Sequence, residues 1–149
     1  MDEALRQLVR VWLIKARNDL DTARQISALP DGHLDMAIYH CQQAAEKALK
    51  GFLAFHDHDL ERTHDLKRLV QFAAADDPAF TRWMDAATLL TPYVAAYRYP
   101  GESAALEPDR AEFDEALSTA GEFVQFVLSL LPPDVKPNAE NGNKHDPEE

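Results

Sequence analysis

One amphipathic stretch, Leu34–Phe55, constrains this chain more than any other segment. Wound as an α-helix at about 100° per residue, it separates into two faces. One face is apolar and consists of Leu34, Ala37, Ile38, Cys41, Ala44, Ala45, Ala48, Phe52 and Phe55. The three alanines in its middle remove bulk, which lets a second helix approach closely. This stretch is therefore predicted to form both the core of the fold and one wall of any site.

The opposite face of the same stretch groups an amide, a carboxylate and two amines within two turns. It carries Met36, Tyr39, Gln43, Glu46, Lys47 and Lys50. A solvated face with Glu46 and Lys50 as a helical i,i+4 pair is the simpler interpretation. Alternatively, Lys47 and Lys50 point at one anion, while Gln43 and Glu46 line a nucleotide pocket or form a polar network in a dimer interface.

Four further helical segments accompany this stretch. Their apolar residues recur with the period of a helix, five glycines is a low number for 149 residues, and no segment alternates long enough to predict a strand. Three of these segments are Glu3–Ala28, His64–Ala75 with Thr63 as N-cap, and Pro108–Leu131. The fourth begins at Asp77-Pro78, is interrupted at Thr91-Pro92 and ends at Pro100-Gly101. The pattern predicts an all-α fold, a five-helix antiparallel up-and-down bundle.

The expected domain organisation is one bundle over residues 1–131 and an acidic tail over 132–149. The tail, PPDVKPNAENGNKHDPEE, is rich in proline, asparagine and acidic residues and has a single branched aliphatic residue, Val135. Such a segment cannot bury enough apolar surface to offset the entropy of ordering, so it is predicted to be disordered.

Composition excludes several classes of function. The net charge of −11 argues against non-specific binding of duplex DNA, although a local basic cluster can still bind a nucleotide or a short RNA. The apolar runs are too short for a membrane span, and the N-terminal region does not have the pattern of a signal peptide. A single cysteine, Cys41, favours a reducing, cytoplasmic setting and a buried, inert thiol.

A few polar residues remain as site candidates, each with a structural alternative. Arg98 can clamp a phosphate with its planar fork, or pair with a carboxylate at a helix end. His64 can contact a ligand, or simply lock its loop to the Leu34–Phe55 helix. Tyr99 is expected to be a packing or interface residue together with Tyr93 and Tyr97, and Asp19 is expected to be solvated.

The run His56-Asp57-His58-Asp59 has the residue types of a metal site but no fixed scaffold or recurring partner. We expect it to be a polar loop. No metal and no cofactor are predicted for the chain.

Four motifs in order give a specific resemblance. They are ARNDLDTA at 16–23, QQAAEKALK at 42–50, THDL at 63–66 and RYP at 98–100. Together they closely resemble the HEPN domain family over roughly Ala16 to Leu131. The resemblance implies a helical bundle that commonly dimerises and is often paired with a minimal nucleotidyltransferase, in toxin–antitoxin or related systems. It also implies nucleotide binding in some members and metal-independent ribonuclease activity in many.

The ribonuclease signature of that family, an arginine followed four to six residues later by histidine, is absent here. Arg98 is followed by Tyr99-Pro100-Gly101, and the next histidine is His145. The sequence therefore favours a non-catalytic homodimer, partnered by a minimal nucleotidyltransferase, that binds a nucleotide or RNA phosphate. Its expected binding residues are Gln43, Glu46, Lys47, Lys50, His64, Arg98 and Tyr99. The alternatives are a toxin-like endoribonuclease with a variant site around Arg98, His64 and Tyr99, or a purely structural dimeric adaptor.

Overall fold

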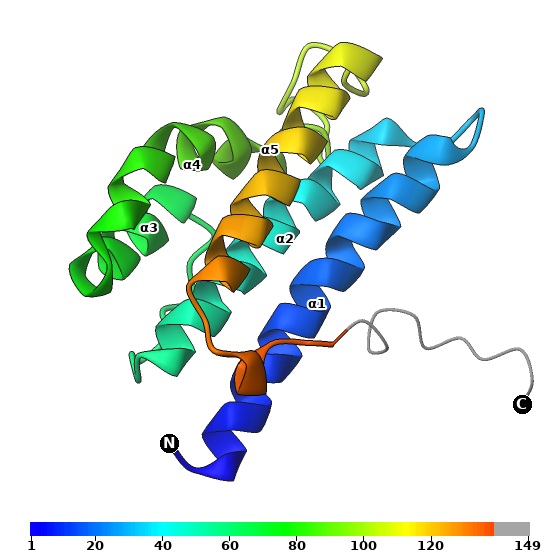
Figure 1. The fold of residues 1–149 in the computed structure, drawn as a ribbon. Helices are drawn as coiled ribbons and strands as arrows, with labels where there is room; N and C mark the ends of the chain where they lie inside the picture. The colour runs from blue at the N-terminus through cyan, green and yellow to red at the C-terminus, as the bar shows by residue number, and fades with distance from the viewer. Residues whose placement is uncertain (139–149) are drawn as a thin grey trace, which may run out of the picture.

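The second helix is the centre of the fold (Figure 1). The computed structural model describes residues 1–138. It contains three long helices and two short ones: α1 (Glu3–Ala28), α2 (Leu34–Phe55), α3 (Leu66–Asp76), α4 (Met84–Leu90) and α5 (Arg110–Ser129). The other four helices all contact α2. The described residues contain no strand, so the predicted all-helical fold with five helices is confirmed.

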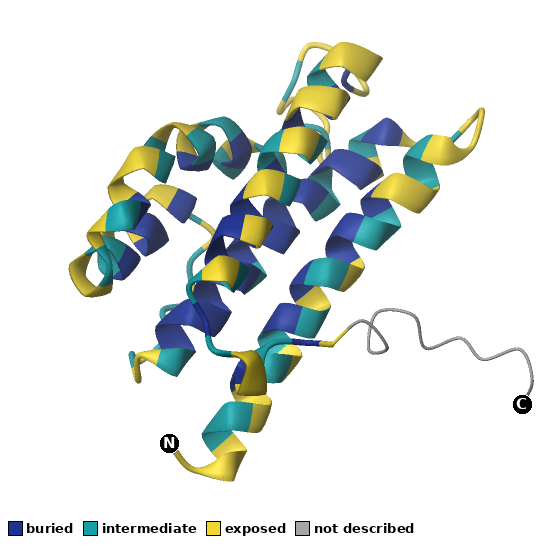
Figure 2. Ribbon diagram, viewed as in Figure 1, coloured by how far each residue is buried: buried dark blue, intermediate teal, exposed yellow. Residues whose placement is uncertain are grey.

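The burial of α2 follows from this central position. Every residue of its predicted apolar face is buried except Phe55, which is half-buried. Leu49 and Leu53 are buried as well, so apolar packing extends well around the helix (Figure 2). A helix packed by neighbours on several sides has little surface left for water, so its polar residues need hydrogen-bond partners within the protein.

The start of α3 differs from the prediction. Asp65, and not Thr63, is the N-cap: its carboxylate accepts a hydrogen bond from the Lys67 amide at 3.0 Å. Thr63 stabilises the turn before the helix, because its hydroxyl oxygen accepts a hydrogen bond from the Asp65 amide at 3.1 Å. The carboxylate takes the capping position, and the helix begins at Leu66, two residues later than predicted.

The segment after α3 is more broken than expected. Asp77 is an N-cap as predicted, since it accepts from the Ala79 amide at 3.0 Å. However, a 3₁₀ helix, η1 (Pro78–Trp83), precedes the short α4, and a second one, η2 (Thr91–Val94), follows it. Pro92 lacks the amide that an α-helix needs there, which accounts for the predicted interruption.

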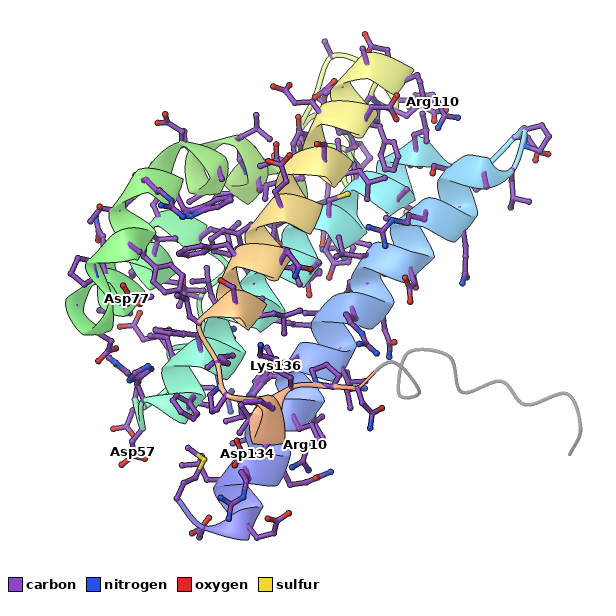
Figure 3. The ribbon with its side chains drawn as sticks, in the orientation of Figure 1. Arg10, Asp57, Asp77, Arg110, Asp134 and Lys136 are labelled. Carbon is purple, nitrogen blue, oxygen red and sulfur yellow. The ribbon has the colours of Figure 1, made fainter. Side chains whose placement is uncertain are left out.

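The first residues of the predicted tail are ordered against α1. A short 3₁₀ helix, η3 (Pro133–Val135), buries Val135 completely. The Arg10 guanidinium donates to the Asp134 carbonyl at 2.7 Å, and Figure 3 shows the two residues together at one end of α1. The expected disorder is therefore wrong for residues 132–138, because one aliphatic side chain finds a place in the core. Residues 139–149 lie outside the described part of the chain.

The predicted turn Leu29-Pro30-Asp31-Gly32 joins α1 to α2 and depends on a glycine. A Cβ atom on Gly32 would lie 1.8 Å from the Ile26 carbonyl oxygen, which is a backbone atom and cannot swing away. The Gly32 amide also donates to the Leu29 carbonyl at 3.1 Å. The close approach of the chain to the end of α1 is thus possible only without a side chain.

We expect Gly32→Ala to lower the free energy of unfolding by about 1–3 kcal/mol, the usual cost of forcing extra atoms into a packed site. Urea denaturation, monitored by circular dichroism, measures this change in the free energy of unfolding. Gly121→Ala in α5 is the matched control: the nearest atom to its added Cβ is the end of the Arg24 side chain at 3.7 Å. There we expect a gain of about 0.5–1 kcal/mol from helix propensity. Equal effects of the two substitutions would contradict this account.

Candidate functional site

The polar face of α2 is largely buried from Gln43 onward, although its residue types favoured a solvated surface; Met36, at the start of this face, is exposed. Gln43, Glu46 and Lys50 are each less than 9% exposed, and Lys47 is half-buried. Buried charges are stable only when they are paired and hydrogen-bonded. The partners of these residues therefore decide what the face can do.

An aspartate from α1 supplies the first group of partners. Asp19 Oδ1 lies 2.7 Å from His40 Nδ1. Its Oδ2 lies 2.8 Å from Lys47 Nζ, an ion pair whose angles fall outside those of a hydrogen bond. We call these three residues the Asp19 cluster. Asp19 is only 7% exposed, so the expectation that it is solvated is wrong: its carboxylate faces α2 and joins the two helices.

A glutamate within α2 supplies the second group. Glu46 Oε2 lies 2.8 Å from Lys50 Nζ, which confirms the predicted i,i+4 pair. Glu46 Oε1 lies 2.8 Å from Nδ1 of His64, 18 residues further along the chain. We call Glu46, Lys50 and His64 the Glu46 cluster. His64 thus locks the loop before α3 to α2, one of the two roles considered for it.

Two amides complete the hydrogen bonding of the Glu46 cluster. Gln42 Nε2 donates to Glu46 Oε1 at 3.1 Å and to the His64 carbonyl at 3.2 Å. Gln43 Nε2 donates to the Gln42 side-chain oxygen at 2.7 Å. Gln42 is fully buried, and the sequence reasoning did not select it as a site residue. Its spacing of four residues from Glu46 is the signal that could have found it.

These contacts control the protonation of Glu46. Burial alone would raise the pKa of its carboxyl group. Hydrogen bonds from Lys50, His64 and Gln42 outweigh that effect and hold the pKa below the usual value of 4.5. At neutral pH the group is an ionised carboxylate, which accepts hydrogen bonds and donates none.

We expect Glu46→Gln to lower the free energy of unfolding by about 3 kcal/mol at pH 7, because it leaves the buried Lys50 ammonium group without its anion. A folded-state pKa below the unfolded one stabilises the protein above the unfolded pKa, and this contribution is lost as the pH falls through the folded value. The deficit of the variant should therefore shrink below about pH 4.5.

Urea unfolding at pH 7 and at acidic pH measures this difference. Glu61→Gln is the control, because Glu61 pairs with Arg68 on the surface and screening by water makes such pairs weak. A deficit that stays constant across the pH range would contradict the role given to the Glu46 carboxylate.

Arg98 lies in a different environment from the two lysines. It is exposed, its guanidinium donates to the Val94 carbonyl at 3.1 Å, and it lies 4.1 Å from the centre of the Tyr39 ring. Tyr99 flanks it as well, with its ring centre 5.3 Å from the guanidinium carbon. Within residues 1–138 no carboxylate forms an ion pair with Arg98, so the predicted alternative of a helix-end ion pair is not what the structure contains.

A cleft of about 450 Å³ opens beside Arg98, between the start of α2 and the segment that leads to α5. Tyr97, Arg98 and Tyr99 line it from one side, and His33, Asp35 and Glu107 are among the residues that line it elsewhere. Glu107 also accepts a hydrogen bond from the Leu34 amide at 3.2 Å, which ties the segment to the first turn of α2. The cleft thus lies beside the first turn of α2, and Arg98 in its lining contacts the ring of Tyr39 on the same helix.

The other two tyrosines of the predicted group have structural roles. Tyr93 and Tyr97 stack in nearly parallel planes and donate to the two oxygens of Glu112, at 2.7 and 2.8 Å. Burial and the neighbouring carboxylate raise the pKa of the Tyr93 hydroxyl. These contacts fix the segment after α4 to the first turn of α5, in agreement with the predicted packing role.

The remaining chemical candidates are also engaged in the structure. Cys41 is buried, and burial raises the pKa of its thiol to about 12, in agreement with the expected inert role. His58 binds the Asp76 carboxylate at the end of α3. Across residues 1–138 no group of three or more histidine, cysteine and acidic side chains has the arrangement of a metal site. Over the same range no helix is long and apolar enough to cross a membrane.

The geometry defines a helical bundle with a polar network on its central helix and a cleft beside the first turn of that helix. The sequence profile of the HEPN domain matches residues 9–130. This chain therefore belongs to the HEPN domain family.

Solved structures agree with this assignment. The crystal structure of TT1696 from Thermus thermophilus is similar with a TM-score of 0.70 and 31% sequence identity, over 84% of this chain and 99% of that one. An archaeal HEPN homologue, ST0689, is similar with a TM-score of 0.62 and 27% identity, over 82% and 96% of the two chains. No protein of curated function matches.

Proposed function

We propose that this chain is a HEPN-type bundle that binds a nucleotide or an RNA-derived phosphate in the cleft at Arg98. We further propose that it acts as a homodimer and works with a minimal nucleotidyltransferase partner. The observation that carries the binding proposal is the contrast between the three candidate cations. Lys47 and Lys50 are paired with buried carboxylates, whereas Arg98 is exposed beside a cleft and has no ion-pair partner in the described chain.

The two lysines are poor phosphate ligands in this arrangement. Each Nζ lies 2.8 Å from a carboxylate oxygen that is itself buried, Asp19 for Lys47 and Glu46 for Lys50. A phosphate that took either lysine would leave a buried carboxylate without its cation, which is costly. Of the seven binding residues expected from the sequence, only Arg98 and Tyr99 line the cleft, so in this proposal the other five, Gln43, Glu46, Lys47, Lys50 and His64, are not ligands.

Arg98 has the geometry that phosphate binding needs. One of its five N–H groups is used on the Val94 carbonyl, and the planar fork leaves donors for two phosphate oxygens. The guanidinium also lies over the rings of Tyr39 and Tyr99. Tyr99 is 55% exposed, so its ring also offers a stacking surface for a base.

The acidic residues of the cleft limit the size of the ligand. Asp35 and Glu107 line the same cleft, and the chain as a whole carries a net charge of −11. These charges repel an extended polyanion more strongly than a compact one. They favour a mononucleotide or the end of a short RNA over a long strand.

We expect isothermal titration with ATP, GTP and short RNA oligonucleotides to give binding heat for at least one of them. Arg98→Ala should weaken that binding about 10- to 100-fold, because hydrogen bonds to charged groups contribute about 1.5–3 kcal/mol. Tyr99→Ala should weaken binding of a nucleotide more than binding of inorganic phosphate, since only the nucleotide has a base to stack.

Arg82→Ala is the matched control for Arg98→Ala. Arg82 is also exposed and also lies over an aromatic ring, that of Phe126 at 5.1 Å, but it does not line the cleft. Binding should be unchanged in this variant. The absence of heat with every ligand, or equal losses in the two arginine variants, would contradict the proposal.

The endoribonuclease alternative receives less support from the geometry. Its three residues lie in separate contacts: His64 binds Glu46, while Arg98 and Tyr99 lie together at the cleft. Acid–base cleavage of RNA needs a titrating group and a cation at one phosphate. The structural adaptor remains the simplest rival, and the same titrations distinguish it because an adaptor binds none of the ligands.

Exposed apolar side chains on α1 support the homodimer. Leu8 and Val11, three residues apart on α1, are 46% and 37% exposed. We expect light scattering to give twice the chain mass of 16.8 kDa, and Leu8→Asp to reduce it toward one chain. Lys67→Asp, on the exposed part of α3, is the control for added negative charge away from this face. A monomeric mass for the wild type would exclude the dimer. The proposed partner is tested separately: a larger complex on co-expression with a small nucleotidyltransferase would support it.

A further inference from the structure

The Asp19 and Glu46 clusters have the same construction. In each, one carboxylate oxygen contacts Nδ1 of a histidine and the other contacts a lysine ammonium group, and all four distances are 2.7–2.8 Å. The carboxylates are buried, with side chains 9% and 6% exposed. The histidines differ: the His64 side chain is 62% exposed, but that of His40 is 27% exposed.

The carboxylate determines which nitrogen of His64 carries the proton. Ionised Glu46 can only accept a hydrogen bond, so the proton of the neutral ring must be on Nδ1. Nε2 then holds the free electron pair. A carboxylate on one ring nitrogen also increases the electron density at the other, as it does for histidines in catalytic and metal sites.

Nε2 of His64 is directed away from this anchor. The only side-chain partner that the structure gives this ring within residues 1–138 is Glu46, through Nδ1, and most of the side chain is in contact with solvent. His64 does not line the cleft at Arg98. Because most of the side chain is exposed, a reagent or another protein can reach the ring from outside.

We propose that His64 Nε2 is a phosphoryl-acceptor site, which takes a phosphoryl group from a donor with a good leaving group, such as a phosphoramidate or an acyl phosphate. The inference does not depend on the binding function proposed above. It rests on three observations: a buried carboxylate anchors one ring nitrogen, a lysine balances this carboxylate, and most of the histidine side chain is exposed.

The transfer step is balanced without any further reactant. The Nε2 electron pair attacks phosphorus, the bond from phosphorus to the leaving group breaks, and the leaving group departs with that electron pair. The proton on Nδ1 stays in place, so the ring gains positive charge as the new P–N bond forms. Glu46 faces that charge through Nδ1, and the cluster stabilises the phosphorylated ring.

Treatment of the full-length protein with potassium phosphoramidate tests the proposal. We expect His64 to be phosphorylated at Nε2 about tenfold faster than His33 in the same chain, a ratio of the size that one charge-assisted hydrogen bond can give. Mass spectrometry of peptides gives the rate at each histidine, and ³¹P NMR distinguishes an Nε2 adduct from an Nδ1 adduct.

Two other histidines serve as internal controls. His33 is exposed but has no side-chain hydrogen bond among the described residues, and His40 has the anchoring carboxylate but is less accessible. Both should react more slowly than His64. His64→Asn, whose amide can still donate to Glu46, should fold normally and lose the fast-labelled site.

Three results would overturn the proposal: equal rates at His64 and His33, labelling of His64 at Nδ1, or no labelling of His64 while His33 reacts. These comparisons are made within the wild-type chain, so they do not depend on the stability of any variant. His33 lines the cleft at Arg98, so the labelling is repeated with the Arg98→Ala protein, in which His64 should still react faster than His33. A failure here is then distinct from a failure of nucleotide binding.

Discussion

Two buried carboxylates, Asp19 and Glu46, hold the polar face of α2 inside the bundle. A carboxylate removed from water is destabilising unless cations and hydrogen-bond donors surround it, and here each one has both a histidine and a lysine. Asp19 thereby joins α1 to α2, and Glu46 joins α2 to the loop that precedes α3. The position of three elements thus depends on two charges that cannot be left unpaired.

The same pairing separates the site candidates into two groups. Lys47 and Lys50 resemble a phosphate-binding pair in sequence, but their charges are used within the protein. The only candidate cation without such a partner in the described chain is Arg98, which lines the cleft and contacts two tyrosine rings. The cation that is available to an anionic ligand therefore lies at the cleft. The polar network of α2 offers a different group, the exposed ring nitrogen of His64.

Much of the fold could be predicted because helices are encoded locally. The bounds of α1 and α2, the Asp77 cap and the break at Pro92 follow from periodicity, capping and proline chemistry within a few residues. The Glu46–Lys50 pair was predictable for the same reason. The errors at Thr63 and Val135 arose where a neighbour decided the outcome: a second capping residue two positions later, and a place in the core that accepts one aliphatic side chain.

The sequence by itself determined an all-helical chain with α2 at its centre, the family to which it belongs and the residue types available for chemistry. Only the tertiary structure decided that the polar face of α2 is buried, that Asp19 is a partner in it, and which cations are free. The physical reason is the distance along the chain. His40 and His64 meet their carboxylates across 21 and 18 residues, and a helical period carries no information about what will pack against a face once the bundle closes.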